Sequence, residues 1–125
     1  MTSGAKYLLD TNYILGLLKS NPDVIAEISI RGLKLSDSCY SAITRMELLG
    51  YPGLRAEEET LINDRLNRIT YLPLTLAIEN RAIQLRQSRK IKLPDAIIAA
   101  TALVHELELL TLDKKLKKVM TEEGV

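Results

Sequence analysis

Short apolar runs alternate with longer stretches of helical periodicity along the chain. Runs of apolar or alternating residues, bounded by polar or chain-breaking residues, predict four strands at residues 7–9, 33–40, 69–72 and 107–112. Apolar residues three or four apart, with capping residues and breakers at the ends, predict seven helices over residues 11–18, 21–31, 41–49, 55–68, 75–89, 94–104 and 113–119. Strands that alternate with helices favour a parallel α/β sheet covered by helices on both faces.

The composition fits a single compact domain spanning residues 1–125. Apolar residues make up 46 % of the chain and charged residues 26 %, which excludes intrinsic disorder as a description of the whole. The net charge is +1, so the overall balance does not indicate a nucleic-acid partner. The longest strongly apolar run, residues 96–104, is too short to span a bilayer, and Asp10 interrupts the only apolar stretch near the N-terminus. We therefore expect a cytoplasmic protein with no membrane association.

The few cysteine and histidine residues limit the metal chemistry. One cysteine, Cys39, makes no internal disulfide, and with a single histidine, His105, there is no Cys/His zinc site. A bound metal must then be held by oxygen, which favours Mg²⁺ or Mn²⁺. We expect Cys39 and Met46 in the core and His105 at a helix end.

Four acidic residues stand at the ends of predicted elements or within apolar helices, where partial burial is expected. Asp10 follows the first predicted strand and Asp113 the last, while Asp95 opens a helix that is apolar almost all round. The fourth, Glu47, lies in the helix over residues 41–49. Each has an ordinary structural explanation, such as a helix cap or a surface position. Together they favour a divalent cation that relieves their repulsion, and with it metal-dependent attack on a phosphodiester.

The segments around these acids resemble PIN-domain ribonucleases, and most closely the VapC-type toxins of toxin–antitoxin pairs. The motifs are Leu8-Leu9-Asp10-Thr11-Asn12, Ser41-x-x-Thr44-x-x-Glu47-Leu48, LPDAIIAATA at residues 93–102, and Leu110-Thr111-x-Asp113. The resemblance covers nearly the whole chain. It implies a PIN-like three-layer α/β/α sandwich with a central, mainly parallel sheet of four to five strands.

The same resemblance implies a set of site residues. It makes Asp10, Glu47, Asp95 and Asp113 the catalytic and metal-binding quartet, which binds Mg²⁺ or Mn²⁺ and hydrolyses RNA. Supporting polar side chains beside the quartet correspond to Thr11, Asn12, Thr44 and Thr111. The chain departs from the family pattern in two places: Lys114-Lys115-Leu116 stands where many relatives have an aromatic residue or His-Phe, and residues 120–125 are short and polar. A fifth strand is therefore missing or only a stub.

Basic residues bracket two of the acids. Between Arg81 and Lys118 nine bases stand against four acids. Possible RNA-binding residues are Arg86, Arg89, Lys90 and Lys92 before Asp95, and Lys114 and Lys115 after Asp113. Such flanks attract a polyanion to an acidic pocket, although solvated helix faces would show the same pattern. Tyr13 or Tyr51 would supply base stacking, or would pack in the core.

Dense apolar stripes on the first two predicted helices exceed what a small domain readily buries, which indicates a partner surface. The resemblance implies a homodimer and a cognate antitoxin peptide lying across such a groove. Three functions remain open: the endoribonuclease toxin of a type II toxin–antitoxin pair, a non-catalytic PIN module that binds RNA or protein, and a Mg²⁺-dependent phosphoacceptor signalling domain. The last is disfavoured because Asp10 has no second acid beside it.

Overall fold

A four-stranded parallel sheet forms the centre of the computed structural model, which describes residues 4–124. The strands are β1 (Tyr7–Leu9), β2 (Ser38–Ser41), β3 (Thr70–Leu72) and β4 (Glu108–Leu110). They lie in the order β3-β2-β1-β4, and every neighbouring pair is parallel. The predicted parallel α/β sheet is confirmed. Because all strands run the same way, their carboxyl ends meet at one edge, where ligands bind in such folds.

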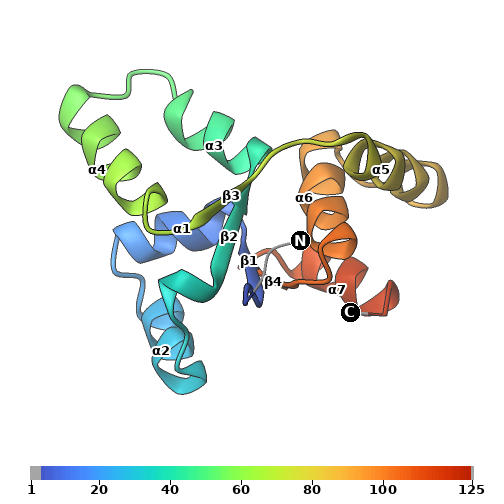
Figure 1. The fold of residues 1–125 in the computed structure, drawn as a ribbon, viewed down its shortest axis with the longest axis horizontal. Coiled ribbons are helices and arrows are strands. Elements are labelled where there is room, and N and C mark those ends of the chain that lie inside the picture. The colour runs from blue at the N-terminus through green and yellow to red at the C-terminus, as the bar shows by residue number, and fades with distance from the viewer. Residues whose placement is uncertain (1–3, 125) are drawn as a thin grey trace.

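Helices cover both faces of this sheet (Figure 1). The helices are α1 (Thr11–Leu18), α2 (Pro22–Arg31), α3 (Ala42–Leu49), α4 (Ala56–Leu66), α5 (Leu76–Ser88), α6 (Leu93–Val104) and α7 (Lys114–Glu122). Leu8 of β1 points into one core with residues of α5, α6 and α7. The next residue, Leu9, points into the other core with residues of α1, α2 and α4. This alternation along a buried strand produces the three-layer α/β/α sandwich that the sequence resemblance implies.

The helix starts follow the capping residues in the sequence. Asp10, Asn21, Ser41, Thr75 and Asp113 each accept a backbone N–H of the helix that follows. Two of these caps are therefore carboxylates of the predicted quartet. The capping bonds fix Asp10 and Asp113 at the points where β1 and β4 give way to helices.

Two expectations about secondary structure and packing are wrong. The strand predicted over residues 33–40 begins only at Ser38, since residues 35–37 form a 3-10 turn (η1, Leu35–Asp37). Leu33 and Leu35 pack against the core without joining a strand, so their alternation reflects burial rather than sheet pairing. Met46 is 56 % exposed rather than in the core, because α3 buries Ala42, Thr44 and Leu48 instead.

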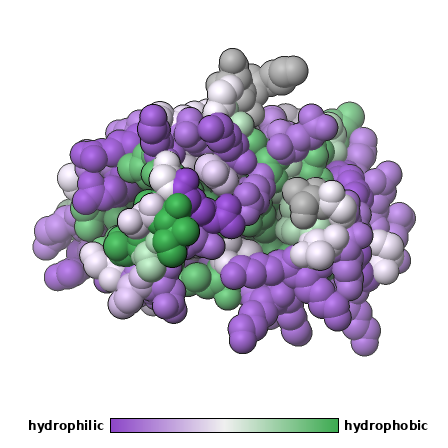
Figure 2. All heavy atoms as spheres, turned by 90° about the horizontal axis from the view of Figure 1, so that it is seen from below, coloured by the Kyte–Doolittle hydropathy of each residue, from purple (hydrophilic) through white to green (hydrophobic). Residues whose placement is uncertain are grey.

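Helix α7, which runs to Glu122, is the last element of the described residues, and residues 4–124 contain no fifth strand. Cys39 is buried and His105 caps the end of α6, as expected. No helix in the described part of the chain is long and apolar enough to cross a membrane. Figure 2 shows one largely hydrophilic face on which apolar side chains gather in separate patches.

Candidate active site

The four predicted acids line one cavity of about 540 Å³, here called the carboxylate pocket. They come from four separate parts of the chain: Asp10 after β1, Glu47 in α3, Asp95 in the first turn of α6 and Asp113 after β4. The lining also includes six apolar or aromatic side chains, Leu15, Leu48, Tyr51, Leu54, Ile62 and Ile98, and one further acid, Glu58. The fold thus gathers residues more than a hundred positions apart into one acidic pocket with a partly apolar lining.

Asp10 is the most enclosed of these acids, with only 5 % of its surface exposed. One carboxylate oxygen accepts the backbone N–H of Thr11 at 2.7 Å, and the other accepts the hydroxyl of Thr111 at 2.7 Å. Burial raises the pKa of Asp10, the two hydrogen bonds lower it, and the charges of Asp95 and Glu47 raise it again. Its carboxylate is therefore firmly oriented but costly to keep charged.

Thr111 links the first acid to the last. The hydroxyl that donates to Asp10 also accepts the backbone N–H of Asp113 at 3.0 Å. The side-chain oxygen of Asn12 accepts the backbone N–H of Leu112 at 3.1 Å, which fastens α1 to the turn after β4. These bonds explain why a threonine and an asparagine stand beside the acids.

Glu47 is held differently. Its carboxylate accepts the hydroxyl of Thr11 at 2.7 Å, and that hydroxyl lies 3.0 Å from the hydroxyl of the buried Thr44. Glu47 itself is exposed, so the expectation that all four acids are partly buried is wrong for this residue. The reason is that α3 buries Thr44 and Leu48 and turns Glu47 toward the open side of the pocket.

Asp95 is half-buried and is repelled by neighbouring carboxylates of the pocket. Burial, and after it the charges of Asp113 and Glu47, raise the pKa of Asp95, while Lys92 lowers it. A divalent cation would remove this repulsion. The acids are therefore placed so that they benefit from a metal ion.

The pocket fits a hydrated ion better than a fully protein-bound one. Within residues 4–124, no three carboxylates lie close enough together to form a ready-made metal cluster. The pocket offers carboxylate, hydroxyl and amide oxygens and contains no histidine or cysteine, which suits Mg²⁺ or Mn²⁺. Mg²⁺ usually keeps several waters and takes only one or two protein carboxylates. Asp10, Glu47, Asp95 and Asp113 are the residues that would hold it.

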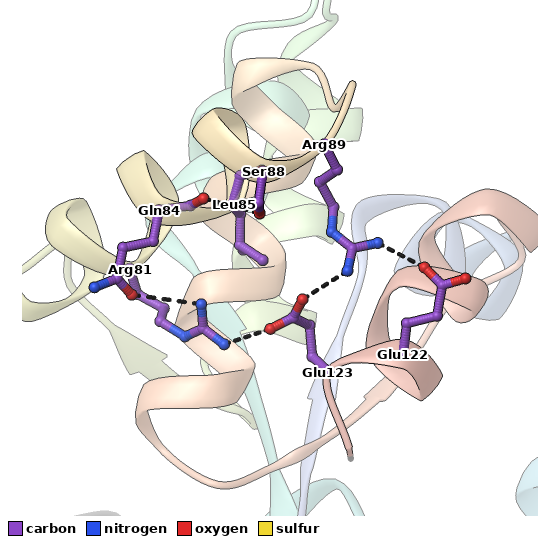
Figure 3. Close-up of polar contacts among 7 residues, drawn as sticks. All are labelled: Arg81, Gln84, Leu85, Ser88, Arg89, Glu122 and Glu123. Atoms are coloured by element: carbon purple, nitrogen blue, oxygen red, sulfur yellow. Dashed lines mark hydrogen bonds and ion pairs between the residues drawn. The ribbon is translucent and has the colours of Figure 1, made fainter.

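The predicted basic residues do not all lie beside the acids. Lys90, Lys92 and Lys115 line a smaller cavity next to the carboxylate pocket, and Arg86 and Lys114 are exposed outside both cavities. Arg89 instead pairs with Glu122 at 2.7 Å and Glu123 at 2.6 Å (Figure 3). The charge of Arg89 is therefore already paired within the protein.

Two residues of the pocket carried little or no signal in the sequence. Lys19, at the end of α1, lines the carboxylate pocket and brings a positive charge to its rim. Tyr51 also lines it and is 69 % exposed, whereas Tyr13 is fully buried and donates its hydroxyl to Glu27. Of the two tyrosines considered for base stacking, only Tyr51 is available. Nothing in the local pattern distinguishes Lys19 from the other basic residues of the chain.

Comparisons with known proteins show which family the chain resembles in sequence and fold. The PIN domain family model matches residues 7–121. A chain of a toxin–antitoxin complex from Klebsiella pneumoniae is 32 % identical, with a TM-score of 0.74 and 88 % of each chain covered. A chain of FitAcB from Neisseria gonorrhoeae is 30 % identical, with a TM-score of 0.70, 92 % of this chain and 93 % of that one covered.

A chain of VapBC-1 from nontypeable Haemophilus influenzae is 28 % identical, with a TM-score of 0.73, 93 % of this chain and 92 % of that one covered. A comparison with curated protein sequences gave no match. The family model covers all four acids of the carboxylate pocket. The chain therefore belongs to the PIN-domain family, and the toxin–antitoxin complexes among its structural relatives support its resemblance to the VapC-type members.

Proposed function

We propose that the protein is a Mg²⁺-dependent endoribonuclease that hydrolyses RNA phosphodiester bonds, with Mn²⁺ able to substitute. The observation that carries this proposal is the convergence of Asp10, Glu47, Asp95 and Asp113 on one pocket. A domain that only binds nucleic acid has no chemical need for four acids facing a polyanion, since they repel it. A divalent cation held by those acids would offset part of their charge and present a positive centre to the phosphate.

In the pocket, the four acids would hold the cation, and the threonine hydroxyls beside them hold two of those acids in place. When bound, Mg²⁺ activates water for attack and stabilises negative charge on the phosphate. The Thr111 hydroxyl orients the carboxylate of Asp10, and the Thr11 hydroxyl orients that of Glu47. The carboxylate of Asp113 is held by the backbone N–H groups of Lys115 and Leu116. Asp95 has the burial and like charges that make it sensitive to the presence of the ion. Such preorganised groups do not have to reorient during the reaction.

The test is RNA cleavage by purified protein free of any partner. A mixed RNA pool is incubated with Mg²⁺, with Mn²⁺ and with a chelator, using the wild type, Asp95→Asn and the control Asp23→Asn. Asp23 is an exposed acid on α2 outside the carboxylate pocket. We expect discrete metal-dependent fragments from the wild type and the control, and none from Asp95→Asn. Cleavage that survives in Asp95→Asn, or in the chelator, would contradict the proposal.

We further propose that the protein is the toxin of a type II toxin–antitoxin pair that acts in the cytoplasm as a homodimer. Its relatives in toxin–antitoxin complexes support the antitoxin partner. An apolar pocket of about 240 Å³ between α1, η1 and α4, rimmed by Arg65 and Arg68, offers a place for an antitoxin segment with apolar and acidic side chains. Light scattering tests the dimer, since a monodisperse monomer would contradict it.

A non-catalytic RNA-binding module is the second candidate. The observation that favours it is the absence, among residues 4–124, of three carboxylates arranged as a preformed metal cluster. This candidate predicts that the wild type retains RNA on a filter with Mg²⁺ and with chelator alike and cuts it in neither. Metal-dependent cleavage would exclude it.

A further inference from the structure

A second, smaller cavity of about 150 Å³ borders the carboxylate pocket. Its walls come from the linker between α5 and α6, the first turn of α6 and the start of α7, and its lining residues include Lys90, Lys92 and Lys115. We call this cavity the lysine pocket. Asp95 and Asp113 line both cavities, so these two acids form the boundary between them.

The sign of the charge changes across that boundary. On one side lie the other two acids of the quartet, and on the other lie three exposed lysines. None of the three lysines forms an ion pair with any residue that the structure describes. Their charges are therefore available to an anionic ligand, unlike that of the neighbouring Arg89.

An arginine–glutamate network beside the lysine pocket ties α5 and the residue after it to the end of α7 (Figure 3). Arg89, directly before Lys90, reaches Glu122 and Glu123 at the end of α7. Arg81, two turns earlier on α5, reaches Glu123 at 2.6 Å. The network thus joins the α5–α6 linker, which carries Lys90 and Lys92, to α7, which carries Lys115.

We propose that the lysine pocket binds the phosphate of the RNA strand that neighbours the phosphate being cut, an inference that rests on the proposed function. A strand that places one phosphate at a cation in the carboxylate pocket must place the next phosphate beside that pocket. The lysine pocket supplies ammonium groups there, and its other lining residues are Ile91, Leu116, Val119 and the two shared acids. It has no aromatic or amide side chain with which to read a base. The contact therefore positions the strand without selecting its sequence.

The test measures binding, so that it does not depend on cleavage. A fluorescein-labelled single-stranded RNA decamer is titrated with protein in chelator, and its anisotropy is followed at several salt concentrations. The variant combines Lys90→Gln, Lys92→Gln and Lys115→Gln. A matched control combines Lys6→Gln, Lys34→Gln and Lys118→Gln, which removes the same charge from three exposed lysines outside both cavities. A third protein carries arginine at the three pocket positions.

Each contact between a lysine and a phosphate contributes about 0.7 to the slope of log affinity against log salt for a single strand. Loss of three contacts should therefore lower that slope by about 2 in the glutamine variant. The control and the arginine variant should keep the wild-type slope. Equal slopes in the pocket variant and the control, or a lowered slope in the arginine variant, would overturn the lysine pocket.

The two proposals fail in different ways. If the wild type cuts RNA with metal but the pocket variant keeps the full salt dependence of RNA binding, the proposed nuclease activity is supported and only the proposal for the lysine pocket is refuted. If the wild type neither binds the decamer nor cuts any RNA, the proposed function falls and the lysine pocket falls with it.

Discussion

Replacing Thr111 with valine removes one hydroxyl from the buried centre of the site and keeps the branched shape of the side chain. That hydroxyl donates to the Asp10 carboxylate at 2.7 Å and accepts the N–H of Asp113 at 3.0 Å. Thr111 is 2 % exposed and Asp10 5 % exposed, so water cannot easily replace either bond. The variant therefore leaves a buried charge with fewer donors.

The expected cost follows from the two bonds. A hydrogen bond to a charged group contributes roughly 1.5–3 kcal/mol, and one between neutral groups about 1 kcal/mol. Thr111→Val should therefore lower the free energy of unfolding at pH 7 by about 3 kcal/mol. Thr101→Val is the matched control, because Thr101 is also buried but donates only to the backbone carbonyl of Ile97. Its expected cost is about 1 kcal/mol.

Urea unfolding followed by circular dichroism measures both costs. The hydrogen bond from Thr111 lowers the pKa of Asp10, although burial raises that pKa overall. The bond is therefore stronger when Asp10 is charged, and the cost of Thr111→Val should be smaller near pH 4 than at pH 7. The reasoning is refuted if Thr111→Val costs no more than Thr101→Val at pH 7, or if its cost does not change with pH.

Three further predictions concern the charge of the site and the packing of the helices. Asp95→Asn should raise the free energy of unfolding at pH 7 in the absence of metal. Burial and neighbouring acids raise the pKa of Asp95 in the folded protein above its ordinary value of 3.8. The free energy of unfolding of the wild type therefore falls as pH rises from 3.8 through the folded pKa. Urea melts should show a flatter pH profile for the variant, which has no carboxyl group to titrate there. Adding Mg²⁺ should raise the melting temperature of the wild type more than that of Asp95→Asn in scanning calorimetry, and an equal rise in both would refute this. Gly16→Ala should lower the free energy of unfolding by about 1–3 kcal/mol, since the new Cβ would lie 2.7 Å from Val24. Adding Val24→Ala should recover part of that loss. If urea melts show that the two substitutions lower the stability additively, the clash is refuted.

The sequence pattern predicted the helix starts well where capping residues mark them. Asp10, Asn21, Ser41 and Asp113 cap helices at the expected places because their side chains satisfy backbone N–H groups locally. The prediction of a strand over residues 33–40 was wrong for its first half, because an alternation of leucines indicates burial and does not require pairing in a sheet. Leu35 in the 3-10 turn and Leu33 before it pack against the core, half-buried, without pairing in the sheet.

The candidate site was predictable in its membership and not in its detail. Sequence order places Asp10 and Asp113 after strands, and parallel strands bring those ends together. The exposure of Glu47 depends on how α3 is rotated about its axis, which no short pattern fixes. The pairing of Arg89 depends on Glu122 and Glu123, which come near only after α7 packs beside α5 and α6. The charge run before Asp95 therefore mixes a structural arginine with free lysines.

The most direct test of the central claim is Mn²⁺ binding to the carboxylate pocket, measured by titration calorimetry. We predict that the wild type binds Mn²⁺, that Asp10→Asn and Asp95→Asn each weaken binding at least about tenfold, and that the exposed control Asp23→Asn binds as the wild type does. Equal binding by the wild type and both pocket variants, or no binding by folded wild type, would contradict the assignment of these acids to one metal site.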